Sequence, residues 1–173
     1  MLLAGGCDRQ GNPPAQPQGE TPGAKPATGV VDRSHRGSAL PDFTLADPAG
    51  KTLRLASLAG KPLLVNLWAT WCAPCVAELP TLQKLAQQGK LRVLTVSQDM
   101  GEPEKVASFL KERGGPALEP WLDPKNDLSF HYATGTLPTT IYYDAKGREV
   151  WRYVGEQDWA GTQAAELLAE AAR

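Results

Sequence analysis

The chain has 173 residues, of which 42% are hydrophobic and 21% are charged, and its formal net charge is −1. This length and composition suit one globular domain. The near-neutral charge argues against nucleic acid as a main partner, because phosphate binding needs a surplus of Lys and Arg. The sequence contains no run of about 18 apolar residues, so it predicts no transmembrane helix.

The N-terminal part of the chain is poor in residues that could form a core. The first 42 residues include no Phe, Trp or Tyr, and residues 8–39 hold five Pro and five Gly. Such a segment cannot bury enough apolar surface to offset its ordering entropy. We therefore predict a disordered tether over residues 8–39 and a folded domain over residues 40–173.

The folded part is predicted to begin with a hairpin and then to alternate strands and helices. Residues 43–45 and 52–55 alternate around a Pro-Gly turn, and residues 63–68 form an apolar run typical of a buried strand. Leucines at three-residue spacing indicate a helix over residues 72–88, and residues 91–96 form the next strand. The remaining elements are expected, in order, at residues 102–113 (helix), 121–122 (strand), 126–132 (short helix), 139–143 and 149–154 (hairpin) and 159–172 (helix).

This order predicts the α/β class. A strand–helix–strand start followed by an antiparallel finish implies a mixed central sheet with helices on both faces.

Three cysteines are present, and two of them form a close pair at the expected start of a helix. Cys72 and Cys75 follow the buried strand, while Cys7 stands alone near the start. The first turn of a helix carries free N–H groups and a partial positive charge, which lower the pKa of a thiol. A spacing of three residues puts both sulfurs on one helix face, and Pro74 suits the first turn.

Three interpretations of this pair are open: a redox dithiol, which the C-x-x-C pattern in a βαβ context favours, a zinc or copper ligand pair, and two structural cysteines. Zinc sites usually draw on four ligands, and only His35 and His131 could complete one here.

Residues 65–75, VNLWATWCAPC, followed by Glu78, Leu79 and Pro80, resemble the TlpA/ResA branch of the thioredoxin superfamily. These are bacterial thiol–disulfide oxidoreductases held at the membrane on its outer side. The resemblance covers about residues 40–170. It implies a thioredoxin-like fold with an extra N-terminal hairpin, and no cofactor beyond a redox-active Cys72–Cys75 disulfide.

The resemblance also implies roles for individual residues. Pro138 matches the cis-proline of the family, which would leave the Leu137 backbone free to pair with a substrate chain; an ordinary trans proline at a strand edge is the alternative. Glu78, one turn beyond Cys75, matches an acid that exchanges protons with the deeper thiol, and a solvent-facing helix carboxylate is the alternative. Substrate-binding residues are expected to be Trp71, Ala73, Pro74, Leu137 and Pro138.

Asn66 stands where thioredoxins proper carry a buried Asp, as it does in the TlpA/ResA branch.

Residues 1–7 resemble the end of a lipoprotein signal, in which Cys7 would receive the lipid. Ala4 replaces the usual Leu and the charged region is missing. A spare thiol and an incomplete secretory signal are the alternatives.

In family terms, the chain would be a monomer anchored to the inner membrane and facing the periplasm. Its Cys72 would attack disulfides of target proteins such as apocytochrome c or copper-site proteins, and Cys75 would resolve the mixed disulfide. A membrane thiol transporter would supply electrons. The rival functions are a copper-binding assembly factor that uses the Cys pair as ligands and a peroxidase, although Cys72 lacks the P-x-x-x-T/S-x-x-C setting of peroxiredoxins.

Overall fold

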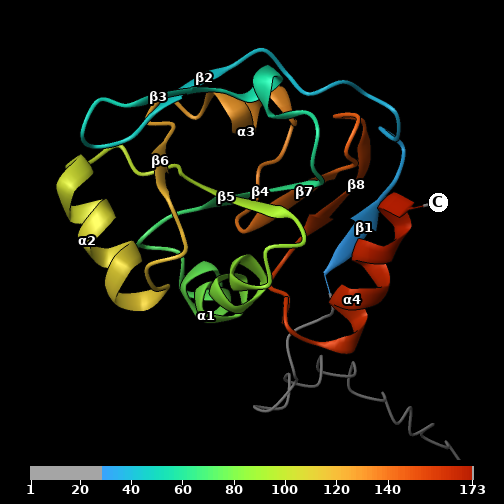
Figure 1. Ribbon diagram of the computed structural model, residues 1–173. Helices are drawn as coiled ribbons and strands as arrows, with labels where there is room; N and C mark the ends of the chain where they lie inside the picture. Colours follow the sequence, from blue (N-terminus) through green and yellow to red (C-terminus); the bar gives the residue numbers. More distant parts are fainter. Residues whose placement is uncertain (1–28, 173) are drawn as a thin grey trace, which may run out of the picture.

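A computed structural model describes residues 29–172 of the chain. Figure 1 shows one central sheet with helices on both of its faces, so the predicted α/β class is confirmed. The strands are β1 (Val30–Asp32), β2 (Thr44–Ala46), β3 (Thr52–Arg54), β4 (Leu63–Trp68), β5 (Arg92–Ser97), β6 (Pro120–Leu122), β7 (Thr139–Tyr143) and β8 (Glu149–Val154). The helices are α1 (Ala73–Gln87), α2 (Pro103–Arg113), α3 (Asp127–His131) and α4 (Thr162–Leu168), with 3-10 turns η1 (Leu55–Leu58) and η2 (Ala169–Ala172).

The eight strands lie in the order β1-β8-β7-β4-β5-β6-β2-β3. Strand β4 runs parallel to β5 and antiparallel to β7, which makes the sheet mixed. The predicted hairpin of β2 and β3 joins the sheet through the pairing of Ala46 with Leu122 on β6. In Figure 1, α1 and α2 lie on one side of the sheet, whereas α3 lies on the other side with the β2–β3 hairpin.

The predicted boundary between tether and domain is wrong. Residues 30–32, assigned to the tether, form the edge strand β1, in which Val30 pairs with Val154 of β8. Beyond β1, the Gly37 amide donates to the Glu149 carbonyl at 2.8 Å. A three-residue strand carries too little periodicity to be predicted, and the exposed edge of β8 provides its hydrogen-bonding partners. Residues 8–28 of the predicted tether, and Cys7 before them, lie outside the described residues.

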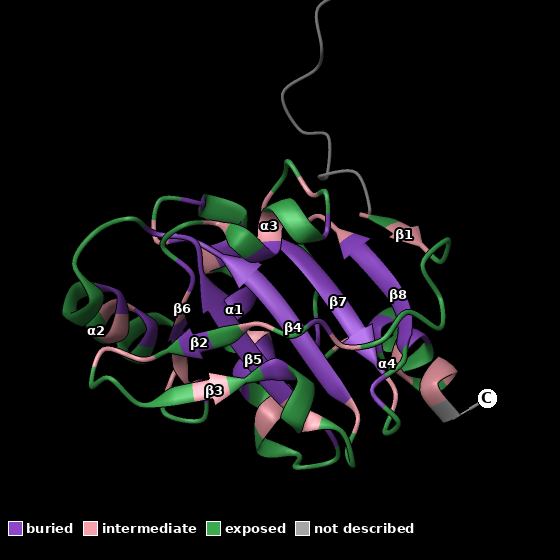
Figure 2. Ribbon diagram, turned by 90° about the horizontal axis from the view of Figure 1, so that it is seen from above, coloured by how far each residue is buried: buried purple, intermediate pink, exposed green. Residues whose placement is uncertain are grey.

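Strand β4 separates two apolar cores. All six of its residues are buried, and Figure 2 shows the central strands as the most buried part of the sheet. Leu64 and Trp68 face the core beneath α1, α2 and α4, whereas Leu63, Val65 and Leu67 face the core beneath α3 and the hairpin. Because side chains alternate along a strand, Asn66 must point to the α1 side.

The crossover from β4 through α1 to β5 places the first turn of α1 at the carboxyl ends of these parallel strands. In open α/β sheets, ligands bind at this edge, because loops and helix N-termini converge there. Among residues 29–172, no helix combines the length and the apolar character needed to cross a bilayer.

Candidate active site

Cys72 and Cys75 form a disulfide at the N-terminus of α1, with an S–S distance of 2.11 Å. Cys72 is the N-cap of the helix, where its extended backbone (φ −91°, ψ 100°) lets Sγ accept a hydrogen bond from the Cys75 amide at 3.3 Å. Ala73 and Pro74 form the first helical positions, where proline costs no hydrogen bond. A thiolate released at position 72 would therefore meet free N–H groups and the positive end of the helix dipole.

The two sulfurs differ in their access to solvent. Cys72 is 6% exposed, whereas Cys75 is fully buried beneath it. Trp71, which precedes the pair, has 71% of its surface exposed. An incoming thiol or disulfide can therefore reach Cys72 but not Cys75.

The Leu137–Pro138 bond is cis, as the resemblance implied. Pro138 leads directly into β7, and Thr139 of that strand pairs with Leu67 of β4. Leu137 lines a surface hollow together with Trp71. The fold thus brings two segments separated by more than 60 residues to the same side of the disulfide, and the predicted residues Trp71 and Leu137 share one surface.

Glu78 is buried, with 1% of its surface exposed, so the alternative of a solvent-facing carboxylate is wrong. Its Oε1 accepts a hydrogen bond from Asn66 Nδ2 at 2.7 Å, and its Oε2 accepts bonds from the Gln157 amide and Trp159 Nε1, each at 3.1 Å. Burial raises the pKa of Glu78 to about 8, outweighing these three hydrogen bonds, which lower it. At neutral pH this carboxyl group holds a proton one helical turn from Cys75.

The amide of Asn66 can serve either protonation state of Glu78. Its Nδ2 donates to Glu78 and also to Thr140 Oγ1 at 3.0 Å, while its Oδ1 is buried without a protein partner among the described residues. A 180° rotation of the amide would turn Oδ1 toward Glu78, where it could accept the carboxyl proton. The Thr140 hydroxyl would then donate to the same oxygen.

A second buried carboxylate, Asp99, fixes the loop before the Cys pair, and sequence reasoning missed it. Asp99 accepts hydrogen bonds from Thr70 N at 3.0 Å, Thr70 Oγ1 at 2.6 Å and Ser97 Oγ at 2.7 Å. The loop from β4 to Trp71 is thereby tied to the end of β5. Asp99 stands just after the buried strand β5, at the carboxyl edge of the sheet. This position is the sequence signal that could have identified Asp99.

The histidines weighed as metal ligands occupy other surroundings. His35 lies beside Asp32, and His131 packs against the rings of Phe43 and Tyr132. In the part of the chain that the structure describes, no three His, Cys, Asp or Glu side chains are close enough together to hold a metal ion.

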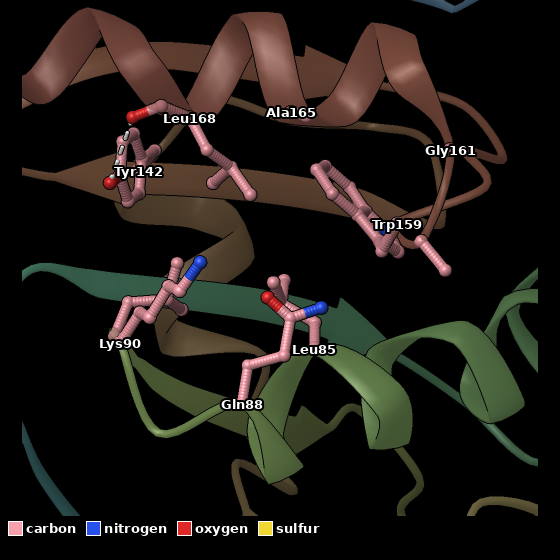
Figure 3. A pocket seen from close by; sticks show the side chains of 10 residues that line it. Leu85, Gln88, Lys90, Tyr142, Trp159, Gly161, Ala165 and Leu168 are labelled. Atoms are coloured by element: carbon pink, nitrogen blue, oxygen red, sulfur yellow. Dashed lines mark hydrogen bonds between the residues drawn. The ribbon is translucent and has the colours of Figure 1, made fainter.

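A cavity of about 260 Å³ lies between the end of α1 and α4, and Figure 3 shows the side chains that line it, among them the polar Gln88 and Lys90. Leu85, Tyr142, Trp159 and Leu168 line it, and neither cysteine does. Trp159 lines this cavity, and its indole nitrogen also donates to the carboxyl group of Glu78. The cavity is therefore distinct from the disulfide site but shares one wall with the proton-holding site behind it.

A mixed sheet, a C-x-x-C disulfide at a helix N-terminus and a cis-proline before the neighbouring strand together define a thioredoxin-like protein. The comparison with protein families agrees: the Redoxin family matches residues 35–168, and the chain belongs to that family.

The chain is similar in sequence to proteins that are named for thiol–disulfide exchange. The chain is 35% identical over 115 residues to "Thiol-disulfide oxidoreductase ResA" of Geobacillus thermodenitrificans, covering 65% of each chain, slightly less than two thirds. It is 34% identical over 143 residues to "Thiol:disulfide interchange protein DsbE" of Vibrio cholerae, covering 78% of this chain and 77% of that relative. The solved structure of the exposed lipoprotein thioredoxin Etrx1 of Streptococcus pneumoniae is similar, with a TM-score of 0.61, 29% identity and coverage of 73% and 98%.

Proposed function

We propose that the protein is a thiol–disulfide oxidoreductase that reduces disulfides in target proteins through Cys72 and Cys75. The observation that carries this proposal is the asymmetry of the pair: Cys72 reaches the surface at a helix N-terminus, while Cys75 is buried one turn from the carboxyl group of Glu78. The disulfide itself is the redox centre, so the reaction needs no further cofactor. Membership of the Redoxin family and the names of its relatives support the same reaction class.

The proposed cycle begins with the reduced protein. The Cys72 thiolate attacks a target disulfide, forms a mixed disulfide and releases one target sulfur as a thiolate. Cys75 then attacks Cys72 Sγ, which releases the second target sulfur and closes the Cys72–Cys75 disulfide. Two electrons pass from the protein to the target.

Glu78 serves as the base for the second step in this cycle. Cys75 must lose its proton before it attacks, and the Glu78 carboxylate is the acid–base group on the same buried helix face. The oxidised protein then carries that proton on Glu78, in agreement with a pKa of about 8 while the disulfide is closed. When an external dithiol reduces the disulfide, Cys75 leaves and takes the proton back.

The target and the electron donor follow from the family resemblance. We infer that the targets are apocytochrome c or proteins with copper sites, whose cysteines must be reduced before they take up haem or metal. A membrane thiol transporter would return the electrons. Trp71, Ala73, Pro74 and the Leu137–Pro138 segment would contact the target chain.

We also infer that the protein works in the periplasm, as a monomer anchored to the inner membrane through Cys7. The name of the similar Streptococcus pneumoniae structure describes that protein as a lipoprotein. The chain from Cys7 to Gly29 can span at most roughly 75 Å when fully extended. This reach is shorter than that of the predicted tether over residues 8–39, because the folded domain already includes β1, which begins at Val30.

Trapping tests the function directly. The full chain with Cys75→Ser should retain target proteins as mixed disulfides on Cys72, and Cys72→Ser should retain none. The wild type should also reduce insulin disulfides when supplied with a dithiol. A wild-type protein that reduces no disulfide but binds copper(I) stoichiometrically would overturn the proposal in favour of the copper-binding factor.

A further inference from the structure

The cavity between the end of α1 and α4 takes no part in the proposed redox cycle. Neither Cys72 nor Cys75 lines it, and its volume is about 260 Å³. For comparison, an apolar cavity of roughly 150 Å³ accommodates benzene. The cavity therefore has room for a small molecule with one aromatic ring and a short side chain.

Two aromatic side chains give the cavity rigid apolar walls. Trp159 and Tyr142 line the cavity and are 2% and 3% exposed. The polar atom of each side chain already has a partner, because Trp159 Nε1 donates to Glu78 at 3.1 Å and the Tyr142 hydroxyl donates to the Leu168 carbonyl at 3.2 Å. Trp159 also stacks on Trp151, with 6.2 Å between the ring centroids. Both rings are thus held in place before a ligand enters, and they offer it apolar surface.

The polar side chains of the cavity stand at its exposed end. Gln88 and Lys90 lie in the segment between α1 and β5, and Figure 3 shows both side chains extending toward α4. In the described part of the chain, neither side chain has a hydrogen-bond or ion-pair partner. No Asp or Glu is among the described residues that line the cavity. The cavity therefore combines an apolar interior with a positive charge and an amide donor at its entrance.

We propose that this cavity binds a short amphipathic carboxylate, whose aromatic or branched hydrocarbon body packs against Tyr142 and Trp159 and whose carboxylate group meets Lys90 and Gln88. The body would bury apolar surface, and the carboxylate would accept a charge-assisted hydrogen bond while staying near solvent. A cationic ligand of the same shape would be repelled by Lys90. The inference goes beyond the proposed function, since it assigns a second site and does not depend on the redox reaction.

Ligands with one body and different head groups test the site. Phenylpropionate, phenylpropanol and phenylpropylamine share the phenyl body and differ in charge, whereas acetate has the carboxylate alone. Each would be titrated into the full chain with its disulfide closed, and amide and indole NMR signals would be followed. We expect a Kd of roughly 0.1–1 mM for phenylpropionate. The alcohol should bind about fivefold more weakly, and the amine and acetate at least about tenfold more weakly.

The indole signals report where the ligand binds. Trp159 lines the cavity, whereas Trp71 lines the hollow beside the disulfide. Phenylpropionate should shift the Nε1–H signal of Trp159, which is identified by its loss in Trp159→Phe, and should leave the Trp71 signal in place. A larger shift at Trp71 than at Trp159 would put the ligand on the surface beside the disulfide and overturn the proposal.

Two variants of the cavity, each with a matched control outside it, complete the experiment. Lys90→Gln should weaken phenylpropionate binding about fivefold and leave phenylpropanol binding unchanged, whereas Lys84→Gln should change neither. Ala165→Leu, which fills the cavity from α4, should weaken every phenyl ligand at least about tenfold, and Ala169→Leu should weaken none. Thermal unfolding by circular dichroism checks that each variant is folded.

Three results would overturn the proposal. One is that phenylpropionate does not bind the wild type at all. Another is that the carboxylate, the alcohol and the amine bind equally well, because Lys90 then selects no anion. The third is unchanged binding in Ala165→Leu. Since disulfide reduction is not a readout, failure of the proposed redox function would leave this test intact.

Discussion

Two buried carboxyl groups flank the Cys pair, and the fold uses them differently. Glu78 and Asp99 are 1% and 9% exposed, and each accepts three hydrogen bonds. The bonds to Asp99 come from Thr70 and Ser97, so they fasten the end of β4 to the end of β5. The bonds to Glu78 come from distant segments that enclose it against the α1 side of the sheet.

This difference shows that a hydrogen-bond count does not decide what a buried carboxyl group does. At Glu78 the loss of hydration outweighs three donors, and the pKa rises to about 8. Glu78 can therefore exchange a proton near neutral pH, next to the thiol that needs one removed. Asp99 instead binds the backbone and the side chain of Thr70, in the loop that leads to Trp71 and Cys72.

The largest expected effect is on the pH dependence of stability. Because the pKa of Glu78 is raised in the folded state, the folded protein keeps a proton that the unfolded chain loses above about pH 4.5. The free energy of unfolding of the wild type, relative to that of Glu78→Gln, should fall by up to roughly 1.4 kcal/mol per pH unit between about pH 4.5 and about pH 8. Above about pH 8 the difference should level off. Urea unfolding at several pH values measures this difference.

The comparison with Glu78→Gln cancels the other titrating groups. Partial burial lowers the pKa of His131, so its contribution to stability rises with pH, opposite in sign to that of Glu78. The glutamine can be accommodated, because rotation of the Asn66 amide offers Oδ1 to its new donor. Parallel stability curves for the two proteins would show that Glu78 titrates normally.

The next effect concerns the rate at which Cys75 resolves the mixed disulfide. Without a base beside the buried thiol, Glu78→Gln should slow this step by about a hundredfold, the lower range for general base catalysis. Stopped-flow measurement of a preformed mixed disulfide on Cys72 gives this rate, and its rise with pH should be lost in the variant. If Asp99→Asn slows the step equally and also loses its rise with pH, then Glu78 and Asp99 do not differ in their roles.

Replacement of Asp99 should act on stability rather than on proton transfer. Asp99→Asn exchanges one acceptor oxygen for a donor, so it leaves Thr70 or Ser97 without one of its partners and should cost about 1–3 kcal/mol. Urea unfolding measures the loss. The pH dependence that Glu78 imposes should persist in this variant, which would separate a positioning residue from a proton carrier.

The smallest effect tests one donor to Glu78. Trp159→Phe removes the Nε1 donor but keeps an aromatic ring, which in the wild type stacks on Trp151 at 6.2 Å between centroids. Loss of a donor to the ionised form should raise the pKa of Glu78 further and move the pH profile of the resolving step upward. The stability should fall by about 1 kcal/mol. A downward movement of the profile would show that this indole does not stabilise the carboxylate.

Much of the fold could be predicted from local pattern. Strands β7 and β8 have the predicted bounds, and α1 has the predicted Cys72 as its N-cap and continues through Pro80. Strand β1 was missed because its hydrogen-bonding partner is the edge of β8, about 120 residues away in the chain. Trp71 and Leu137, which line the hollow beside the disulfide, were predicted, but Met100 and Phe130, which also line it, belong to no common motif and were missed.

The sequence alone determined the chemistry of this protein: two cysteines three residues apart, at the start of a helix that follows a buried strand. Helix geometry and the helix dipole act over one turn, so local residues suffice to place and activate the pair. Only the tertiary structure decided the cis state of Pro138, the burial that raises the pKa of Glu78 and the fastening of the loop by Asp99. Desolvation and long-range hydrogen bonds depend on which distant segments the sheet brings together, and no local pattern contains that information.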